Sequence, residues 1–260
     1  MIAALRIHLE CIRIALASRM AYRGDFFISV AMLFIGEFVA PLIIYLVYST
    51  GSSFPGWNLY EVLLIQAIFL ISKGIAFPLF FGMVWRTLRG VREGTFDLLL
   101  LKPRPVLYLS IVTAFDIDDL GKLIGGVLLL VISLSHLPPP NVLEWLQFAI
   151  LLALSVLMLL SCVLLMSGSV FKWVGNSRVY EIFDCLTSFG QYPRSIFSRS
   201  FQTILSFIIP IAMLGFFPAS ALLGKPAPGM GWASAACIAF FLLCLLFWNR
   251  MLRYYTSAGG

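Results

Sequence analysis

Long stretches without a charged residue are the feature that most restricts the fold of this chain. Five windows of about twenty residues or more contain no Asp, Glu, Lys or Arg: Phe38–Tyr60, Leu123–Leu143, Trp145–Phe171, Ser200–Gly224 and Pro226–Asn249. A sixth window, Val62–Trp85, is interrupted only by Lys73. A helix of about twenty apolar residues is long enough to cross the hydrocarbon core of a bilayer. The sequence therefore predicts six transmembrane helices.

Composition excludes most other fold classes. Apolar residue types make up 61% of the 260 residues and charged types only 12%, whereas soluble domains are about half apolar and about a quarter charged. These residues cannot supply the polar surface of a soluble protein of this length. The predicted fold class is an all-α polytopic membrane helix bundle. No gap between the windows is long enough for a soluble domain, so residues 1–260 are expected to form a single membrane domain.

The basic residues are distributed as in a multi-pass membrane protein. Of 18 Lys and Arg residues, 15 precede the first window, follow the last, or lie in every second loop, while the remaining loops contain only Lys225. The positive-inside rule then places both termini in the cytoplasm, in a plasma (inner) membrane. Because this topology accounts for the basic excess, we expect membrane lipid and no nucleic acid as a partner.

The first 23 residues have the pattern of an amphipathic helix. Ile2, Leu5 and Leu9 recur at helical spacing on one face, and Arg6 and Arg13 lie on another. A basic amphipathic helix suits the headgroup region of a membrane. Residues 1–23 are therefore predicted to form an interfacial helix before the first span.

Two ionisable residues, Glu37 and Lys73, lie well inside predicted spans. Such groups are expensive in hydrocarbon and usually face a bundle interior or a wet cavity. A mutual salt bridge would neutralise both, so a packing role is the first interpretation and a place on a transport pathway the second. In the same helix as Lys73, Pro78 is expected to produce a kink.

The loop at residues 86–105 combines basic, apolar and chain-breaking residues. Between Gly94 and Pro103, the side chains of Phe96, Leu99 and Leu100 are predicted to form one apolar face of a short helix. An apolar patch in a loop of this kind usually docks onto membrane or protein. Asp97 is expected to cap this short helix or to pair with a neighbouring basic residue.

The order Glu93-Gly94-x-Phe96-Asp97-x-x-Leu100-x-Lys102-Pro103 resembles the loop of small six-span permeases of ATP-binding-cassette exporters, the ABC-2 class. Tyr192-Pro193, then Pro210 and Pro218-Ala219, resemble a later run of the same family. In that family the first of these loops contacts the ATPase subunit. The resemblance implies that role for these residues: Arg92, Glu93, Gly94, Phe96, Asp97, Leu99, Leu100, Lys102 and Pro103.

The same resemblance implies a transport function without an energy source of its own. The chain would form the substrate pathway of an exporter together with a second permease copy or a homologous permease, and cytoplasmic ABC ATPase subunits would drive it. The sequence contains no GxxxxGK[ST] phosphate-binding loop. We therefore expect no cofactor, metal ion or catalytic residue in this chain, and we expect ATP and Mg²⁺ to bind the partner ATPase.

Two alternatives belong to other functional classes. Asp116, Asp118 and Asp119 would serve an intramembrane enzyme that acts on a lipid-linked substrate, although ion pairs of Asp118 and Asp119 with Lys122 at helical spacing favour an interfacial charged collar. The other alternative is a non-catalytic membrane assembly subunit.

Residues 176–224 allow two arrangements. Hydropathy favours a fifth span at 198–217 that follows an interfacial helix, and this is the arrangement preferred from the sequence. The family resemblance implies instead a span at 178–192, with Glu181 and Asp184 buried in protein, followed by a re-entrant pair at 193–223. In that arrangement Arg194 and Arg199 lie on the outer side.

Overall fold

The protein is described by a computed structural model that covers residues 10, 12–14, 17–18, 20, 23–116, 119–173 and 179–256. The described residues form helices joined by short loops, without strands. Most of the predicted interfacial helix at 1–23 lies outside the described residues. The main helices in chain order are α2 (Arg23–Glu37), α3 (Val39–Ser49), α4 (Leu59–Ala76), α5 (Gly82–Glu93), α6 (Asp97–Leu100), α7 (Val106–Val112), α8 (Leu120–Ser135), α9 (Val142–Val170), α10 (Val179–Ser188), α11 (Arg199–Thr203), α12 (Phe216–Leu222) and α13 (Met230–Leu252).

Four helical segments of the described chain are long and apolar enough to cross a membrane: Arg23–Ser49, Leu59–Glu93, Val142–Val170 and Met230–Leu252. They correspond to the predicted first, second, fourth and sixth spans. Helix α8 occupies the place of the predicted third span, but it has only 16 residues. The all-helical membrane architecture predicted from the sequence is therefore confirmed, whereas the number of six spans stays a prediction.

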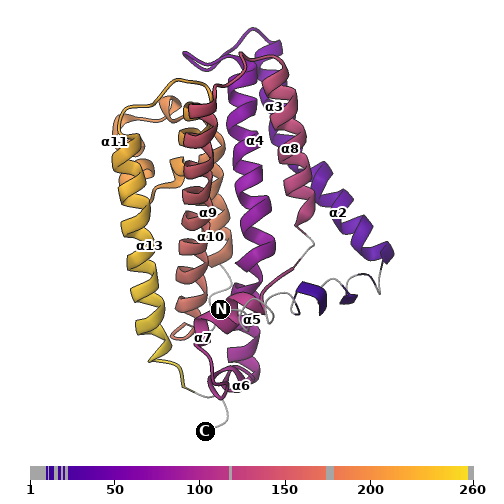
Figure 1. The fold of residues 1–260 in the computed structure, drawn as a ribbon, viewed down its shortest axis with the longest axis vertical. Helices are drawn as coiled ribbons and strands as arrows, with labels where there is room; N and C mark the ends of the chain where they lie inside the picture. Colours follow the sequence, from indigo (N-terminus) through magenta and orange to yellow (C-terminus); the bar gives the residue numbers. More distant parts are fainter. Residues whose placement is uncertain are drawn as a thin grey trace.

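Two of the long helices begin with the same local signal. Asn58 precedes α4 and Asn141 precedes α9, and each side chain accepts a hydrogen bond from the backbone N–H three residues later. Glu61 and Glu144 complete the pattern, because their carboxylates accept from the backbone N–H groups of the two asparagines. This reciprocal capping satisfies donors that a helix start leaves unpaired. Both helices start at the same end of the bundle (Figure 1).

Helix α4 is the centre of the bundle, and its packing against α8 depends on two glycines. A Cβ atom at Gly74 would lie 2.5 Å from the backbone nitrogen of Leu123, and one at Gly126 would lie 2.8 Å from the backbone nitrogen of Ile71. Small residues allow helix backbones to approach this closely in membrane proteins, where packing replaces the hydrophobic effect between helices. The glycines thus fix the distance between α4 and α8.

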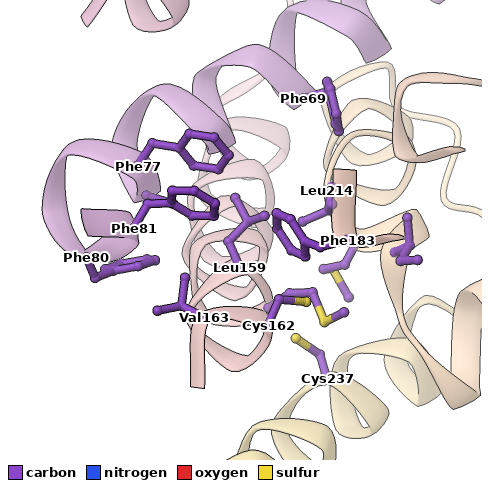
Figure 2. Close-up of a cluster of buried hydrophobic side chains, with 14 of the residues drawn as sticks. Phe69, Phe77, Phe80, Phe81, Leu159, Cys162, Val163, Phe183, Leu214 and Cys237 are labelled. Atoms are coloured by element: carbon purple, nitrogen blue, oxygen red, sulfur yellow. The ribbon is translucent and has the colours of Figure 1, made fainter. Parts of the chain in front are cut away.

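The apolar core lies between α4, α9, α10 and α13. Figure 2 shows Phe77 and Phe81 projecting toward Leu159 of α9, with Phe183 of α10 between Phe81 and Leu214. The rings of Phe77 and Phe81 stack with centroids 4.1 Å apart. Phe77–Phe81 form a π-helical turn that includes Pro78 and joins α4 to α5. The structure thus departs from regular α-helix at the proline, where the sequence predicts a kink.

The segment after α9 corrects the preferred arrangement of the fifth span. The predicted span at 198–217 is not one straight helix: residues Arg199–Ile208 and Ile211–Leu222 form two helical pieces with an angle of 78° between them. Helix α11 lies at the end of the bundle opposite α6 (Figure 1). We refer to these two ends as the α11 end and the α6 end.

Hydrogen bonds locate the residues before the bent pair. The indole N–H of Trp57 donates to Ser195 Oγ at 3.0 Å, and the guanidinium of Arg194 donates to the carbonyl of Pro228 at 3.4 Å. Trp57 lies in the loop before α4, so Arg194 and Ser195 belong to the α11 end. The chain has therefore passed from the α6 end to the α11 end through α10. The prediction of one straight helix at 198–217 is therefore wrong, and the path of the chain is the one that the family resemblance implies. That α10 crosses the membrane stays a prediction.

Buried serines hold the bent pair in the bundle. Ser72 of α4 donates to the carbonyl of Leu214 at 3.0 Å, and Ser155 of α9 donates to the carbonyl of Met213. Both carbonyls lie at the irregular start of the second helical piece. A non-helical backbone is tolerated at membrane depth only where protein groups satisfy it. The two hydroxyls provide these contacts, so the bent pair is stabilised as part of the core.

Candidate functional site

The loop that connects α5 to α7 is a compact structure at the α6 end. Helix α5 ends at Gly94, which adopts φ = 70°, a left-handed conformation that favours glycine. The chain then turns back, and the amide of Phe96 donates to the carbonyl of Gly90 at 3.1 Å. The short helix α6 follows, with Asp97 as its first residue rather than as a cap. Pro105 directly precedes α7.

Phe96 anchors this loop to the body of the protein. Its side chain is only 1% exposed. Its ring lies 5.1 Å from the ring of Phe171, at the end of α9, and 5.1 Å from the ring of Tyr255, just after α13. Trp248 of α13 extends the cluster, since its ring lies 4.9 Å from that of Phe171. The expectation that Phe96 belongs to an exposed docking face is therefore wrong, because its ring is already packed within this chain.

The exposed apolar face of the loop consists of other residues. Leu99 is partly buried against the core, whereas Leu98 is 62% exposed, Leu101 is 80% exposed and Leu100 is also exposed. We call Leu98, Leu100 and Leu101 the leucine face. The chain reverses at Gly94, so Phe96 is buried while the leucine face lies on the outer side of the segment that follows.

Charged residues flank the leucine face in the chain on both sides. The side chains of these residues are exposed: Arg86, Arg89, Arg92, Glu93, Lys102 and Arg104. Asp97 is half-buried and acts on Tyr255: burial and the nearby Asp97 carboxylate raise the pKa of the Tyr255 hydroxyl. The leucine face and its charged border form a surface suited to a protein partner, and Pro103 lies within it, exposed.

The intramembrane charges pair differently from the sequence expectation. Lys73 Nζ lies 3.1 Å from Asp184 Oδ1 of α10, and within the described part of the chain Glu37 forms no salt bridge with it. Lys73 is 8% exposed, and its ammonium lies 4.7 Å from the ring centre of Phe69. The predicted pairing of Lys73 with Glu37 is therefore wrong, because the acid that pairs with Lys73 comes from α10. The sequence alone does not predict this pair, because it does not show that α10 runs beside α4.

A second lysine lies near the first. Lys122 of α8 pairs with Asp119, as the spacing of three residues predicts, and its ammonium lies 4.6 Å from the ring centre of Phe77. Both lysines, Asp119 and Asp184 are close enough to act electrostatically on Glu37. The five residues form a polar cluster between α2, α4, α8 and α10. Because its charges largely compensate one another, the cluster can pack several helices together at membrane depth.

Of the three acidic residues considered for an enzyme, Asp116 and Asp119 are described by the structure, and each contacts a different part of the chain. Asp119 is engaged with Lys122, the amide of Asp116 donates to the carbonyl of Pro78 at 3.0 Å, and Asp118 lies outside the described residues. Across residues 23–116, 119–173 and 179–256, no group of three or more His, Cys, Asp or Glu side chains is placed to hold a metal ion.

Comparison with known proteins identifies the family. No curated protein and no solved structure matches the chain. The family model described as "ABC-2 family transporter protein" matches residues 34–259, which include every helix discussed above except the first part of α2. The match extends over the loop with the leucine face, the polar cluster and the bent pair. The chain therefore belongs to the ABC-2 family of transporter proteins.

Proposed function

We propose that the chain is the membrane-spanning permease subunit of an ATP-driven exporter. It forms the substrate pathway as a dimer, with a second copy or a homologous permease, and separate cytoplasmic ABC ATPase subunits drive it. The α6 end faces the cytoplasm. With α10 as a membrane crossing, Arg194 and Arg199 move to the outer side, and the basic residues still divide 13 to 3 in favour of the cytoplasm.

The leucine face carries this proposal. The three exposed leucines belong to the segment of α6, and α6 lies beyond the ends of α9 and α13 (Figure 1). Exposed apolar patches rimmed by polar residues mark contact sites on proteins. A groove on the ATPase subunit would cover these leucines and pair with the basic residues around them.

The anchor at Phe96 explains how a push on this face reaches the spans. The loop is joined covalently to α5, and the ring of Phe96 contacts residues at the ends of α9 and α13. Displacement of α6 by the ATPase would therefore move three long helical segments together. Rigid packing of this kind transmits small shifts, because a close-packed cluster does not deform continuously.

The polar cluster supports the placement of a second permease. The side chain of Asp184 pairs with buried Lys73, but it is 53% exposed on the surface of α10. A half-exposed carboxylate at membrane depth is costly against lipid. A second permease that packs against α10 would cover it. The substrate pathway would then run along this interface, near Lys73 and Glu37.

Co-purification with the ATPase subunit tests the proposal. The double variant Leu98→Ala, Leu101→Ala removes the two most exposed leucines of the face. The matched control is Leu242→Ala, Leu243→Ala, which removes two exposed leucines from the middle of α13. Anchor residues contribute roughly 1–3 kcal/mol each to protein interfaces. The loop variant should weaken ATPase association at least about tenfold, and ATP turnover of the complex should fall with it. Equal association of the loop variant, the control and the wild type would rule out the leucine face as the contact.

A further inference from the structure

A cavity at the α11 end lies far from the leucine face. Its volume of about 410 Å³ falls within the range of pockets that hold small ligands. Four separate segments build its wall: the loop before α4, the residues after α10, the bent pair, and the loop before α13. The side chains that matter for its chemistry are Trp57, Arg194, Ser195, Gln202, Phe216 and Lys225.

Arg194 brings an uncompensated charge to this cavity. Within the described part of the chain, its guanidinium has no carboxylate partner. It lies 5.6 Å from the ring centre of Phe216 and makes two long hydrogen bonds, to Ser206 Oγ at 3.3 Å and to the carbonyl of Pro228 at 3.4 Å. A guanidinium has five N–H donors, so most of them remain for a ligand. Partial burial lowers the pKa of Arg194 from its ordinary value, because the charged form loses water.

The other charges of the cavity already balance. Lys225 Nζ lies 2.6 Å from Glu61 Oε1, and the second oxygen of Glu61 accepts from the amide of Asn58. An ammonium group has three donors, so Lys225 keeps others for a ligand. Ser195 Oγ accepts from the indole of Trp57, which leaves the O–H of Ser195 as a donor. Donors from three residues therefore converge on a space with one excess positive charge.

We propose that this cavity binds a phosphate group through Arg194, with Lys225 and Ser195 as additional donors. The planar fork of an arginine binds phosphate oxygens in pairs, and donors from several directions fit a tetrahedral anion. The rings of Trp57 and Phe216, whose centres lie 5.7 Å apart, provide an apolar wall for the organic part of the ligand. The phosphate belongs either to a lipid headgroup or to a soluble phosphate ester.

Native mass spectrometry of the detergent-purified chain tests this inference without an ATPase partner. Two probes separate the sources of phosphate: dioleoyl phosphatidylglycerol and glycerol phosphate. The loss of a charged hydrogen-bonding partner typically weakens binding about tenfold or more. Arg194→Gln should therefore lower the affinity for the bound probe at least about tenfold. Arg199→Gln is the matched control, because it removes the same charge from an exposed residue that does not line the cavity, and it should bind like the wild type.

Each result has a defined meaning. Arg194-dependent binding of the phospholipid alone assigns the cavity to a lipid headgroup, and Arg194-dependent binding of glycerol phosphate assigns it to a soluble ester. Size-exclusion chromatography reports whether Arg194→Gln folds, and Lys225→Gln serves in its place if it does not. The inference is refuted if the wild type binds neither probe, or if substitutions at Arg194 and Lys225 change affinity no more than the substitution at Arg199.

Discussion

Replacing Phe96 by alanine should release the loop between α5 and α7 from the bundle. The ring of Phe96 is almost completely buried and contacts two other rings. Truncation of a buried phenylalanine to alanine costs about 3–5 kcal/mol. Tyr255 follows the last helix and can relax into the space, so we expect a value near the lower limit, about 3 kcal/mol. This cost falls on the docking of the loop rather than on the spans.

Hydrogen exchange measures this effect directly. The amide of Phe96 donates to the carbonyl of Gly90 in α5, and the amides of Leu99 and Leu101 donate to carbonyls within the loop. Local opening exposes all three amides to exchange. A loss of about 3 kcal/mol corresponds to roughly a hundredfold increase in the population of the open state. Peptides that cover residues 94–102 should therefore exchange about a hundredfold faster in Phe96→Ala. Peptides from the middle of α9 should exchange at the wild-type rate.

Leu101→Ala is the matched comparison. Leu101 lies in the same loop but is largely exposed, so its truncation should leave exchange of residues 94–102 unchanged and should weaken ATPase association instead. The reasoning fails if Phe96→Ala leaves exchange of the loop at the wild-type level. It also fails if Leu101→Ala accelerates exchange as strongly as Phe96→Ala, because the assignment of anchor and contact face would then be wrong.

Three further experiments test the topology and the packing. Arg199→Cys, in a chain whose native cysteines are replaced, should react with an impermeant thiol reagent added outside. If the new cysteine does not react, Arg199 lies on the inner side, as the arrangement preferred from hydropathy requires. Asp184→Asn should lower the free energy of unfolding in mixed micelles by up to about 3–5 kcal/mol, because it leaves the buried ammonium of Lys73 unpaired. Lys73→Met should cost less, because the Asp184 carboxylate that it leaves unpaired is half-exposed. An equal cost for both variants would contradict this difference in burial. Gly126→Ala should reduce stability by about 1–3 kcal/mol, since the new methyl group would overlap the backbone of α4; wild-type unfolding would show that the two helices separate freely.

The long apolar helices could be predicted from the sequence because their signal is local. Val142–Val170 and Met230–Leu252 appear in the structure close to their predicted ranges, and the Asn-x-x-Glu signals before α4 and α9 fix where these helices begin. Hydropathy and capping depend on residues that are neighbours in the chain. Such features need no knowledge of the tertiary partner.

The place of α10 beside α4 could not be recognised by hydropathy, because it depends on a distant residue. Asp184 makes α10 too polar for a helix in lipid, yet Lys73, more than a hundred residues earlier, pairs with it. Conversely, residues 199–222 are apolar enough for a span but are bent, because Ser72 and Ser155 satisfy the backbone at the irregular segment. Hydropathy averages composition and cannot detect either compensation. Only the family resemblance, carried by Tyr192-Pro193, Pro210 and Pro218-Ala219, implied the path that the chain takes here.

The loop between α5 and α7 shows the same limit at a smaller scale. The sequence predicts that the apolar segment of this loop docks onto another surface. The spacing of Phe96, Leu99 and Leu100 does not show which side of the segment faces the bundle. That choice depends on the turn at Gly94 and on Phe171 and Tyr255, which lie far away in the chain. A single loop can therefore divide its apolar residues between two tasks. Phe96 holds the loop against the bundle. Because the loop is held in place, a force applied to the leucine face would be transmitted to the spans.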